Sequence, residues 1–447
     1  MINPSRRILL KLATMAAVSL SPLLRMARAT IHDNSGNRQG NRTSLPLGVE
    51  EDGFSHVYHA KNGAPEENLT KAIEMIGGID SLIGPQDIVV IKPNAQWWNQ
   101  GMTNTDTIKA FVELVLDIAD FSGEIILAEN HQFPEDNSRG WTTEERNGTY
   151  NYNELIDYFQ QNGFPNVTKY HWHDGGPSVP GLHGGAEGGG VVKGPWEGDG
   201  YVWCHDMVYK STSGYKTLMN YPVFTSSYSG TTIDLKHGAW KDGRYIDRPV
   251  KLINFPSLNH HGTWAGATAA IKNYLGIVDM TCGYRGTQPK GFRNFHYIGV
   301  KQSKVSKIHW QLEILRRKLG LGYISHFDGG AVGHFMRTVR IADLNIISAE
   351  WVGWGSRIDT SLRARTKSVL VGRDPVALDY YAFKNVLLPV TPKESRSIKH
   401  NYSFYDCNDP DREDNPLRWY LKECHEQGVG NLSQDKVKIH KADLSHA

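Results

Sequence analysis

The chain has 447 residues, with 49 Lys or Arg against 47 Asp or Glu, so its formal net charge is only +2. So small a charge creates no strong field, which argues against nucleic acid or an anionic membrane surface as a partner. None of the four cysteines lies in a CxxC or CxxxC pair, which argues against an iron–sulfur cluster held by this chain.

The N-terminus has the pattern of a twin-arginine export signal. Arg6 and Arg7 precede a largely apolar run, 8–24, and a small-x-small cleavage site that ends at Ala29. The run is too short and too interrupted for a stable membrane span, which needs about 20 apolar residues. We therefore expect the twin-arginine machinery to export the folded protein to the periplasm. An uncleaved anchor or a general secretion signal is the alternative.

The rest of the chain divides into a flexible lead-in, 30–48, an α/β domain, 49–405, and a C-terminal extension, 406–447. The domain is long enough for two lobes or for one elaborated core. Two irregular stretches, 174–200 and 283–340, are interpreted as insertions. In the extension we expect one helix, and Cys407 and Cys424 are candidates for a disulfide in an oxidising compartment.

The clearest unit of secondary structure lies between residues 87 and 130. Residues 88–91 form a continuous apolar run, which is typical of a buried parallel strand. Thr105 can cap a helix whose apolar side chains recur every three or four residues, and 125–128 is a second apolar run. This order of elements predicts a βαβ unit.

Two later segments repeat the order of strand and helix. Residues 250–255 predict a strand, and 265–275 predict a helix that ends at Gly276. Residues 367–371 predict a further strand, and Pro375 opens the helix that follows it. The chain is therefore expected to fold as α/β, with a mostly parallel sheet and helices on both of its faces.

Polar residues follow each of these strands at the point where it ends. In an open parallel sheet the carboxyl ends of the strands meet at one edge, where ligands bind. The residues expected at this edge are Lys92, Asn94, Glu129, Asn130, His131, Asn259, His260, His261, Arg373 and Asp374.

Four segments, in this order, resemble motifs of the domain-of-unknown-function 362 family. They are Lys92-Pro93-Asn94 with Thr103, the stretch 253–276, Asp343-Leu344-Asn345-Ile346, and Arg373-Asp374-Pro375 with Asp379. The resemblance covers roughly residues 85–390 and implies an exported α/β protein without a settled activity. A distant similarity of fold to nickel-pincer lactate racemases is suspected for this family, which is an analogy only.

The chain departs from the family pattern in two places. Asn259 stands where the family usually has a lysine, so any role of that lysine has no counterpart here. Many relatives carry a ferredoxin-like cluster segment, for which this chain lacks the cysteines.

Two lysines are candidates for holding an anionic group. Lys92 follows a strand, where it could instead form a structural salt bridge. Lys272 lies in the last turn of a predicted helix, where it could simply offset the helix dipole. Asp374, directly before a proline, has the position of a helix cap. The other predicted ligand-binding residues are Asn94, Asn259, Asn273 and Arg373.

Histidines at two strand ends are candidates for metal binding or proton transfer. His131, His260 and His261 could hold zinc, iron, nickel or copper, which imidazole suits. Glu129 beside His131 could instead form an acid–base pair. Because the chain has 19 histidines, chance adjacency is the competing interpretation.

The sequence leaves two hypotheses about function. The first is an enzyme of oxidoreductase or isomerase type that uses a mononuclear metal or an organic cofactor on a small anionic or polyhydroxylated molecule. Its catalytic residues would be His131, His261 and Glu129. The second is a non-catalytic periplasmic binding, maturation or accessory protein, which the 12 Trp and 20 Tyr favour. Nucleophilic hydrolysis is disfavoured because the sequence contains no GxSxG motif.

Overall fold

The computed structural model describes residues 45–130, 139–173, 190–211, 214–262, 265–279, 291–293, 295, 327–398 and 402–445. The predicted export signal, 1–29, and nearly all of the predicted lead-in lie outside these ranges. So do His131 and most of the two predicted insertions.

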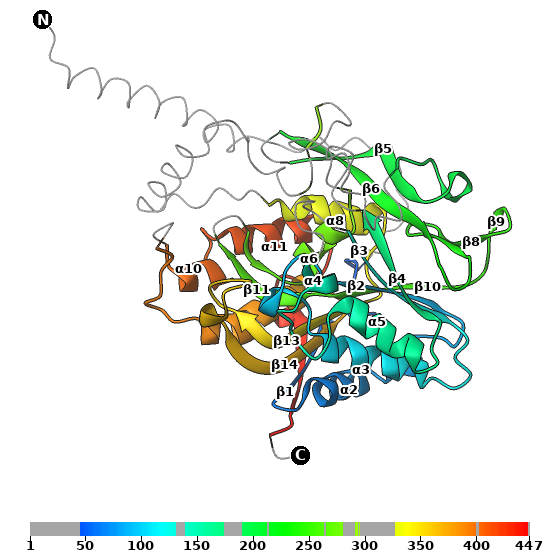
Figure 1. The fold of residues 1–447 in the computed structure, drawn as a ribbon. Coiled ribbons are helices and arrows are strands. Elements are labelled where there is room, and N and C mark those ends of the chain that lie inside the picture. The colour runs from blue at the N-terminus through cyan, green and yellow to red at the C-terminus, as the bar shows by residue number, and fades with distance from the viewer. Residues whose placement is uncertain are drawn as a thin grey trace, which may run out of the picture. The chain divides into compact units, whose positions relative to one another are not determined.

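A ten-stranded sheet lies at the centre of the described structure (Figure 1). Its strands are β1 (Ser55–Lys61), β2 (Ile88–Pro93), β3 (Glu124–Asn130), β4 (Val167–His173), β10 (Val250–Phe255), β11 (Ser257–Gly262), β12 (Gly266–Thr268), β13 (Leu344–Gly353), β14 (Ala364–Gly372) and β15 (Val437–Asp443). Five neighbours, β13, β10, β2, β3 and β4, run parallel. The predicted mostly parallel sheet is thus confirmed, and so are the strands predicted at 88–91, 125–128 and 250–255.

Helices cover both faces of this sheet because its central strands are apolar on both sides (Figure 1). On β2, Val89 and Ile91 point into one hydrophobic cluster, whereas Ile88 and Val90 point into the other. The first cluster is closed by α2 (Pro65–Met75), α3 (Thr105–Leu116) and α5 (Tyr152–Gln161). The second is closed by α6 (Ala270–Asn273), α8 (Gly329–Thr338), α9 (Pro375–Ala382) and α11 (Pro416–Glu426).

The cap of α3 is one residue earlier than predicted. Asn104, not Thr105, is the N-cap, and its side-chain oxygen accepts a hydrogen bond from the Thr107 backbone N–H at 2.9 Å. The Thr105 hydroxyl instead donates to the Tyr150 carbonyl, which ties the start of α3 to the loop before α5.

The helix predicted at 265–275 is divided into three short elements. β12 pairs with β11 as a hairpin, α6 follows, and a 3-10 turn (Tyr274–Gly276) closes the segment. Gly266 has φ +71°, a left-handed conformation that interrupts a right-handed helix, and Leu417 packs where a side chain at this position would lie. The apolar spacing of this segment therefore does not reflect a single helix.

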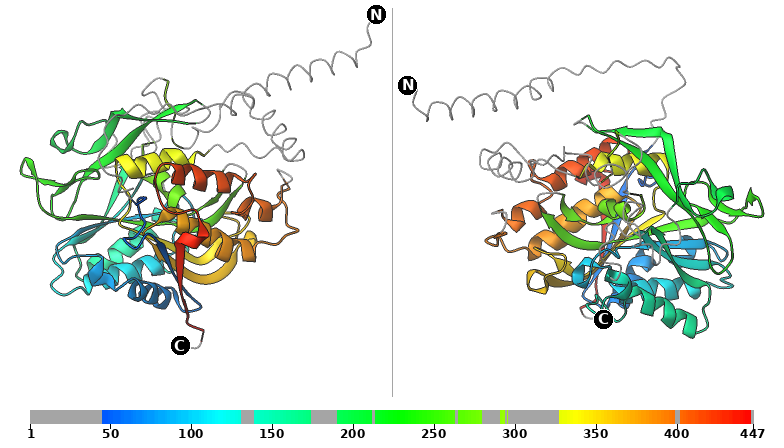
Figure 2. Two further views of the ribbon diagram at one scale, coloured as in Figure 1. Left: turned by 180° about the vertical axis from the view of Figure 1, so that it is seen from behind. Right: turned by 45° about the horizontal axis from the view of Figure 1, so that its top comes forward.

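A second, antiparallel sheet was not predicted. It is a meander of β5 (Gly200–Lys210), β6 (Lys216–Thr225), β7 (Thr232–Asp234), β8 (Gly238–Lys241) and β9 (Arg244–Tyr245). Figure 2 shows it, in green, beside the central sheet. It packs there through Phe224, whose ring contacts Tyr170 and Trp172 of β4.

The predicted C-terminal extension is built into the main fold. β15 adds a parallel edge strand beside β1, and α11 packs on α8. Cys424 lies in the large hydrophobic cluster, whereas Cys407 lies in a separate small cluster, and no disulfide joins them. Packing and strand pairing hold the extension on the main fold, without the disulfide considered from the sequence. Within the described ranges, none of the helices has both the length and the apolar character needed to cross a bilayer.

Candidate functional site

A pocket opens where the parallel strands end, as the topology of the sheet predicts. Seven of the residues chosen from the sequence line it: Lys92, Asn94, Glu129, Asn259, His261, Lys272 and Asn273. Four further lining residues were not predicted: Gln96, Trp97, Thr268 and Arg357. The enclosed part measures about 20 Å³, which is room for one or two water molecules. A ligand larger than this therefore has to extend from the enclosed part into the open part of the pocket.

A buried ion pair forms the floor of the pocket. Lys92 Nζ lies 2.6 Å from Glu129 Oε2, and each residue is only 1 % exposed. Burial raises the pKa of Glu129 to about 8, against the attraction of Lys92, and lowers the pKa of Lys92, against the attraction of Glu129. Burial thus favours the uncharged form of each group, while the contact between them favours the charged forms.

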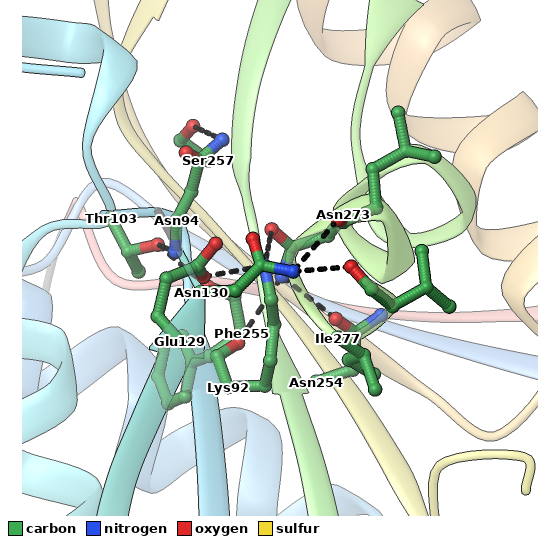
Figure 3. A network of polar contacts seen from close by, with 12 residues as sticks. Lys92, Asn94, Thr103, Glu129, Asn130, Asn254, Phe255, Ser257, Asn273 and Ile277 are labelled. Carbon is green, nitrogen blue, oxygen red and sulfur yellow. Dashed lines mark hydrogen bonds and ion pairs between the residues drawn. The ribbon is translucent and has the colours of Figure 1, made fainter. Parts of the chain in front are cut away.

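Buried asparagines hold this pair in place across the sheet (Figure 3). Lys92 Nζ donates to Asn273 Oδ1 at 2.7 Å, and Asn273 Nδ2 donates to Asn254 Oδ1 at 2.8 Å. Asn254 Nδ2 in turn donates to Asn345 Oδ1 at 2.8 Å. Because every link is buried and hydrogen-bonded, the network fixes the position of the lysine ammonium. The asparagines come from two of the family-like segments, and Lys92 comes from a third.

Gly276 has no side chain, and the ion pair occupies the space where one would lie. A Cβ atom at this position would overlap both Glu129 Oε1 and Lys92 Nζ. In the sequence this glycine is only a helix stop, so its role at the site was missed. The close approach of two side chains from other strands is not visible in the pattern around it.

Asp379 positions the short helix that carries Lys272 and Asn273. Its two carboxylate oxygens accept the backbone N–H groups of Ala270 and Ile271 at 2.7 and 2.9 Å. These are donors at the start of α6 that no residue of α6 itself can satisfy. Asp379 is thus a positioning residue: α9 holds α6 through it.

Arg357 is the main functional residue that the sequence did not indicate. It lies after β13, and its Nη1 donates to His261 Nδ1 at 2.8 Å. Its guanidinium stacks 4.2 Å from the Trp97 ring centroid, and Arg139 lies 5.1 Å from the same ring. Burial lowers the pKa of Arg357 to about 10, which still leaves it charged at neutral pH.

Lys272 adds a further basic group to the pocket. It is 6 % exposed, and its Nζ lies 5.5 Å from the centroid of the Phe327 ring. Burial, with repulsion from Arg357 and Lys92, lowers its pKa well below the usual range. Among the described lining residues the lysine and arginine side chains are Lys92, Lys272 and Arg357, whereas the carboxyl group is that of Glu129. This excess of basic groups favours an anionic ligand.

Two asparagines predicted at the site have mainly structural partners. Asn259 Nδ2 donates to the Gln100 carbonyl at 2.9 Å, and its Oδ1 accepts the Gly353 N–H at 3.0 Å. Asn130 Nδ2 donates to the Val278 carbonyl at 2.5 Å, and Asn130 is not among the described residues that line the pocket. A third asparagine, Asn94, lines the pocket, and its backbone N–H donates to the Thr103 hydroxyl.

Arg373 and Asp374 do not lie in the pocket, contrary to the prediction. β14 runs antiparallel to β13, so its carboxyl end points away from the edge where β2, β3 and β10 end. Asp374 is the N-cap of α9, accepting the N–H groups of Val376 and Ala377, while Arg373 is exposed. The alternative interpretation of Asp374 as a helix cap is thereby confirmed.

The described residues do not fit the predicted metal site. His260 and His261 alternate on β11 and therefore face opposite ways. His260 Nδ1 lies 2.7 Å from Asn408 Oδ1, whereas His261 contacts the Arg357 guanidinium, which opposes a metal cation. Among described residues no three histidine, cysteine, aspartate or glutamate side chains gather as metal ligands would. His131 lies outside the described residues, so its predicted roles in metal binding and catalysis stay predictions.

His260 is expected to make the fold sensitive to acid. Burial lowers its pKa from 6.5 to about 4, so between these values the unfolded chain binds more protons than the folded one. Its contribution to stability is therefore present above pH 6.5 and is lost as the pH falls toward 4, by about 3 kcal/mol. His260→Asn should remove this loss, as measured by urea unfolding at pH 7, 5.5 and 4.5.

Replacement of the exposed His205 by Asn is the matched control for this titration. Its stability curve should follow that of the unmodified chain. Identical pH slopes for the His260 variant and the unmodified chain would contradict the assignment.

Comparisons with protein-family models, with curated proteins and with solved structures each returned no match. The resemblance to the domain-of-unknown-function 362 family therefore stays a prediction, and the function must be argued from the site itself.

Proposed function

We propose that this protein is an enzyme that binds a small carboxylate-bearing molecule in the pocket and transfers a proton at the carbon next to its carboxylate or carbonyl group. The observation that carries the proposal is the convergence of Lys92, Lys272 and Arg357 on a pocket that also contains the buried carboxyl of Glu129. A ligand carboxylate would balance the excess of basic groups there.

Each part of the pocket has a role in this reaction. Arg357, whose planar guanidinium suits a carboxylate, would bind and orient the ligand. Glu129 would accept or return the proton, since a carboxyl with a pKa of about 8 is well matched to acid–base catalysis near neutral pH. Lys92 would stabilise the charge that develops when the proton leaves.

A non-catalytic binding protein is the second candidate. It is favoured by the tight Lys92–Glu129–Asn273 network, whose polar atoms are largely directed at one another. In such a protein the network would only orient a ligand. The two candidates differ in whether the bound molecule exchanges a proton.

Deuterium exchange separates the two candidates. Lactate, glycerate, pyruvate and 2-oxobutyrate, each mixed with the purified protein in D₂O, would be followed by proton NMR. We expect loss of the signal next to the carboxylate or carbonyl carbon above the buffer rate, and a loss of that activity by about 100-fold or more in Glu129→Gln. Binding without exchange would support the second candidate, and no binding of any of the four would contradict both.

We also propose that the protein acts outside the cytoplasm after export in the folded state. The paired Arg6 and Arg7 with the apolar run that follows support this. Fractionation of cells that produce the full chain tests it, because retention in the cytoplasm would contradict export.

A further inference from the structure

A short turn after β2 lies directly against the loop that carries Arg357. The turn is a 3-10 helix (Asn99–Gly101), and the loop follows β13. A Cβ atom at Gly101 would lie only 2.7 Å from the Arg357 carbonyl oxygen, so the two backbones meet at a distance that only glycine allows. Because β10 separates β2 from β13 in the sheet, this contact is made beyond the strand ends. The position of Arg357 therefore depends on the turn as well as on its own strand.

Gln100 binds this loop on both sides of Arg357. It is fully buried, and its Nε2 donates to the carbonyls of Ser356 and Asp359, at 2.9 Å each. The first of these carbonyls lies directly before Arg357 in the chain, and the second lies two residues after it. One amide thus satisfies two carbonyls and fixes the conformation of the loop between them.

Two asparagines complete the contact between the turn and the loop. Asn99 Nδ2 donates to the Ile358 carbonyl at 3.0 Å. Asn259 Nδ2 donates to the Gln100 carbonyl at 2.9 Å, and its Oδ1 accepts the Gly353 N–H at 3.0 Å. The whole loop is therefore held by side chains of other segments.

We propose that Gln100 is a positioning residue for Arg357. Gln100 is not among the described residues that line the pocket, so it acts on a ligand only through the arginine. It fixes the backbone from which the guanidinium extends, while the Trp97 ring, 4.2 Å away, holds the charged end. A guanidinium held in one orientation binds a planar carboxylate with less loss of entropy. This role deepens the proposed function and rests on it, because Arg357 is proposed there to bind the ligand carboxylate.

The reactivity of Arg357 toward phenylglyoxal, which modifies arginine side chains, tests the position of the guanidinium directly. The full purified chain would be treated with the reagent, and the labelling of each arginine would be followed by peptide mass spectrometry. Gln100→Met keeps a similar volume but removes the donor. In this variant we expect Arg357 to be labelled at least about 5-fold faster, because the loop opens more often and releases the guanidinium from Trp97. The exposed Arg373 should be labelled at the same rate in both proteins.

Titration of the same folded proteins with lactate measures the consequence for binding. We expect about 10-fold weaker binding in Gln100→Met. Gln160→Met is the matched control, since Gln160 Nε2 donates to the Val167 carbonyl at 3.0 Å and Gln160 is not among the described lining residues. This control should keep both the lactate affinity and the labelling rate of Arg357. A Gln100 variant that loses only stability, with affinity and labelling unchanged, would overturn the proposed role.

Asn99→Gly is a second variant that preserves the turn. It removes one hydrogen bond to the loop, and glycine readily adopts the φ of +50° found at Asn99. Arg357 should again be labelled faster, by about 2-fold or more.

The unmodified chain separates a failure of this role from a failure of the proposed function. If it binds lactate, and Arg357 is labelled no faster in the folded Gln100 and Asn99 variants, then Gln100 does not position Arg357 and the anion pocket still stands. If the unmodified chain binds none of the four acids, the proposed function fails, and the role of Gln100 in binding fails with it.

Discussion

Replacing Gly276 with alanine is expected to abolish ligand binding and to destabilise the fold by about 1–3 kcal/mol. The new methyl group would overlap Glu129 Oε1 and Lys92 Nζ, both of which are buried. These side chains can escape only by breaking the ion pair and the hydrogen bond to Asn273. Urea unfolding would measure the stability, and calorimetric titration with lactate would measure binding.

Gly190→Ala is the matched control for this substitution. Nothing lies within 4 Å of a Cβ atom built at Gly190, so binding and stability should stay close to those of the unmodified chain. If Gly276→Ala bound lactate as well as this control does, the ion pair could not form the floor of the binding site.

Removing either member of the buried ion pair should cost about 3–5 kcal/mol of stability, because each leaves its partner buried without a counter-charge. Lys92→Met and Glu129→Leu keep similar volumes while removing the charges. The double variant should lose clearly less stability than the two single losses added together, by at least about 2 kcal/mol. Lactate binding should be lost in all three proteins.

Urea unfolding of the four proteins gives this double-mutant cycle directly. The two residues lie on adjacent parallel strands with their charged atoms 2.6 Å apart, so strong coupling is required. Additive single effects would show that the contact contributes little and that the carboxyl of Glu129 is held by other groups.

Much of the site was predictable because strand ends are visible in the sequence. The apolar runs of β2 and β10 predicted the strand ends after which Lys92 and Asn259 follow. Because parallel strands end at one edge of a sheet, both residues were expected at the same site. The same rule failed for Arg373, since an apolar run does not encode whether a strand runs parallel or antiparallel to its neighbours.

Other features depend on contacts between distant segments. Arg357 and Trp97 lie in loops, and only the folded chain brings the guanidinium onto the ring. Gly276 was recognised as a breaker of helices but not as the space for two side chains from β2 and β3. The second sheet was missed for two reasons. Its strands β7, β8 and β9 have only two to four residues, and the buried and exposed positions of the longer β5 and β6 do not alternate.

The central claim is that the pocket recognises a carboxylate. Calorimetric titration with lactate and with propane-1,2-diol, its neutral analogue of similar size, tests this most directly. We predict saturable binding of lactate, no measurable binding of the diol, and loss of lactate binding in Arg357→Gln. Equal binding of the two molecules, or lactate binding that survives the loss of Arg357, would contradict the claim.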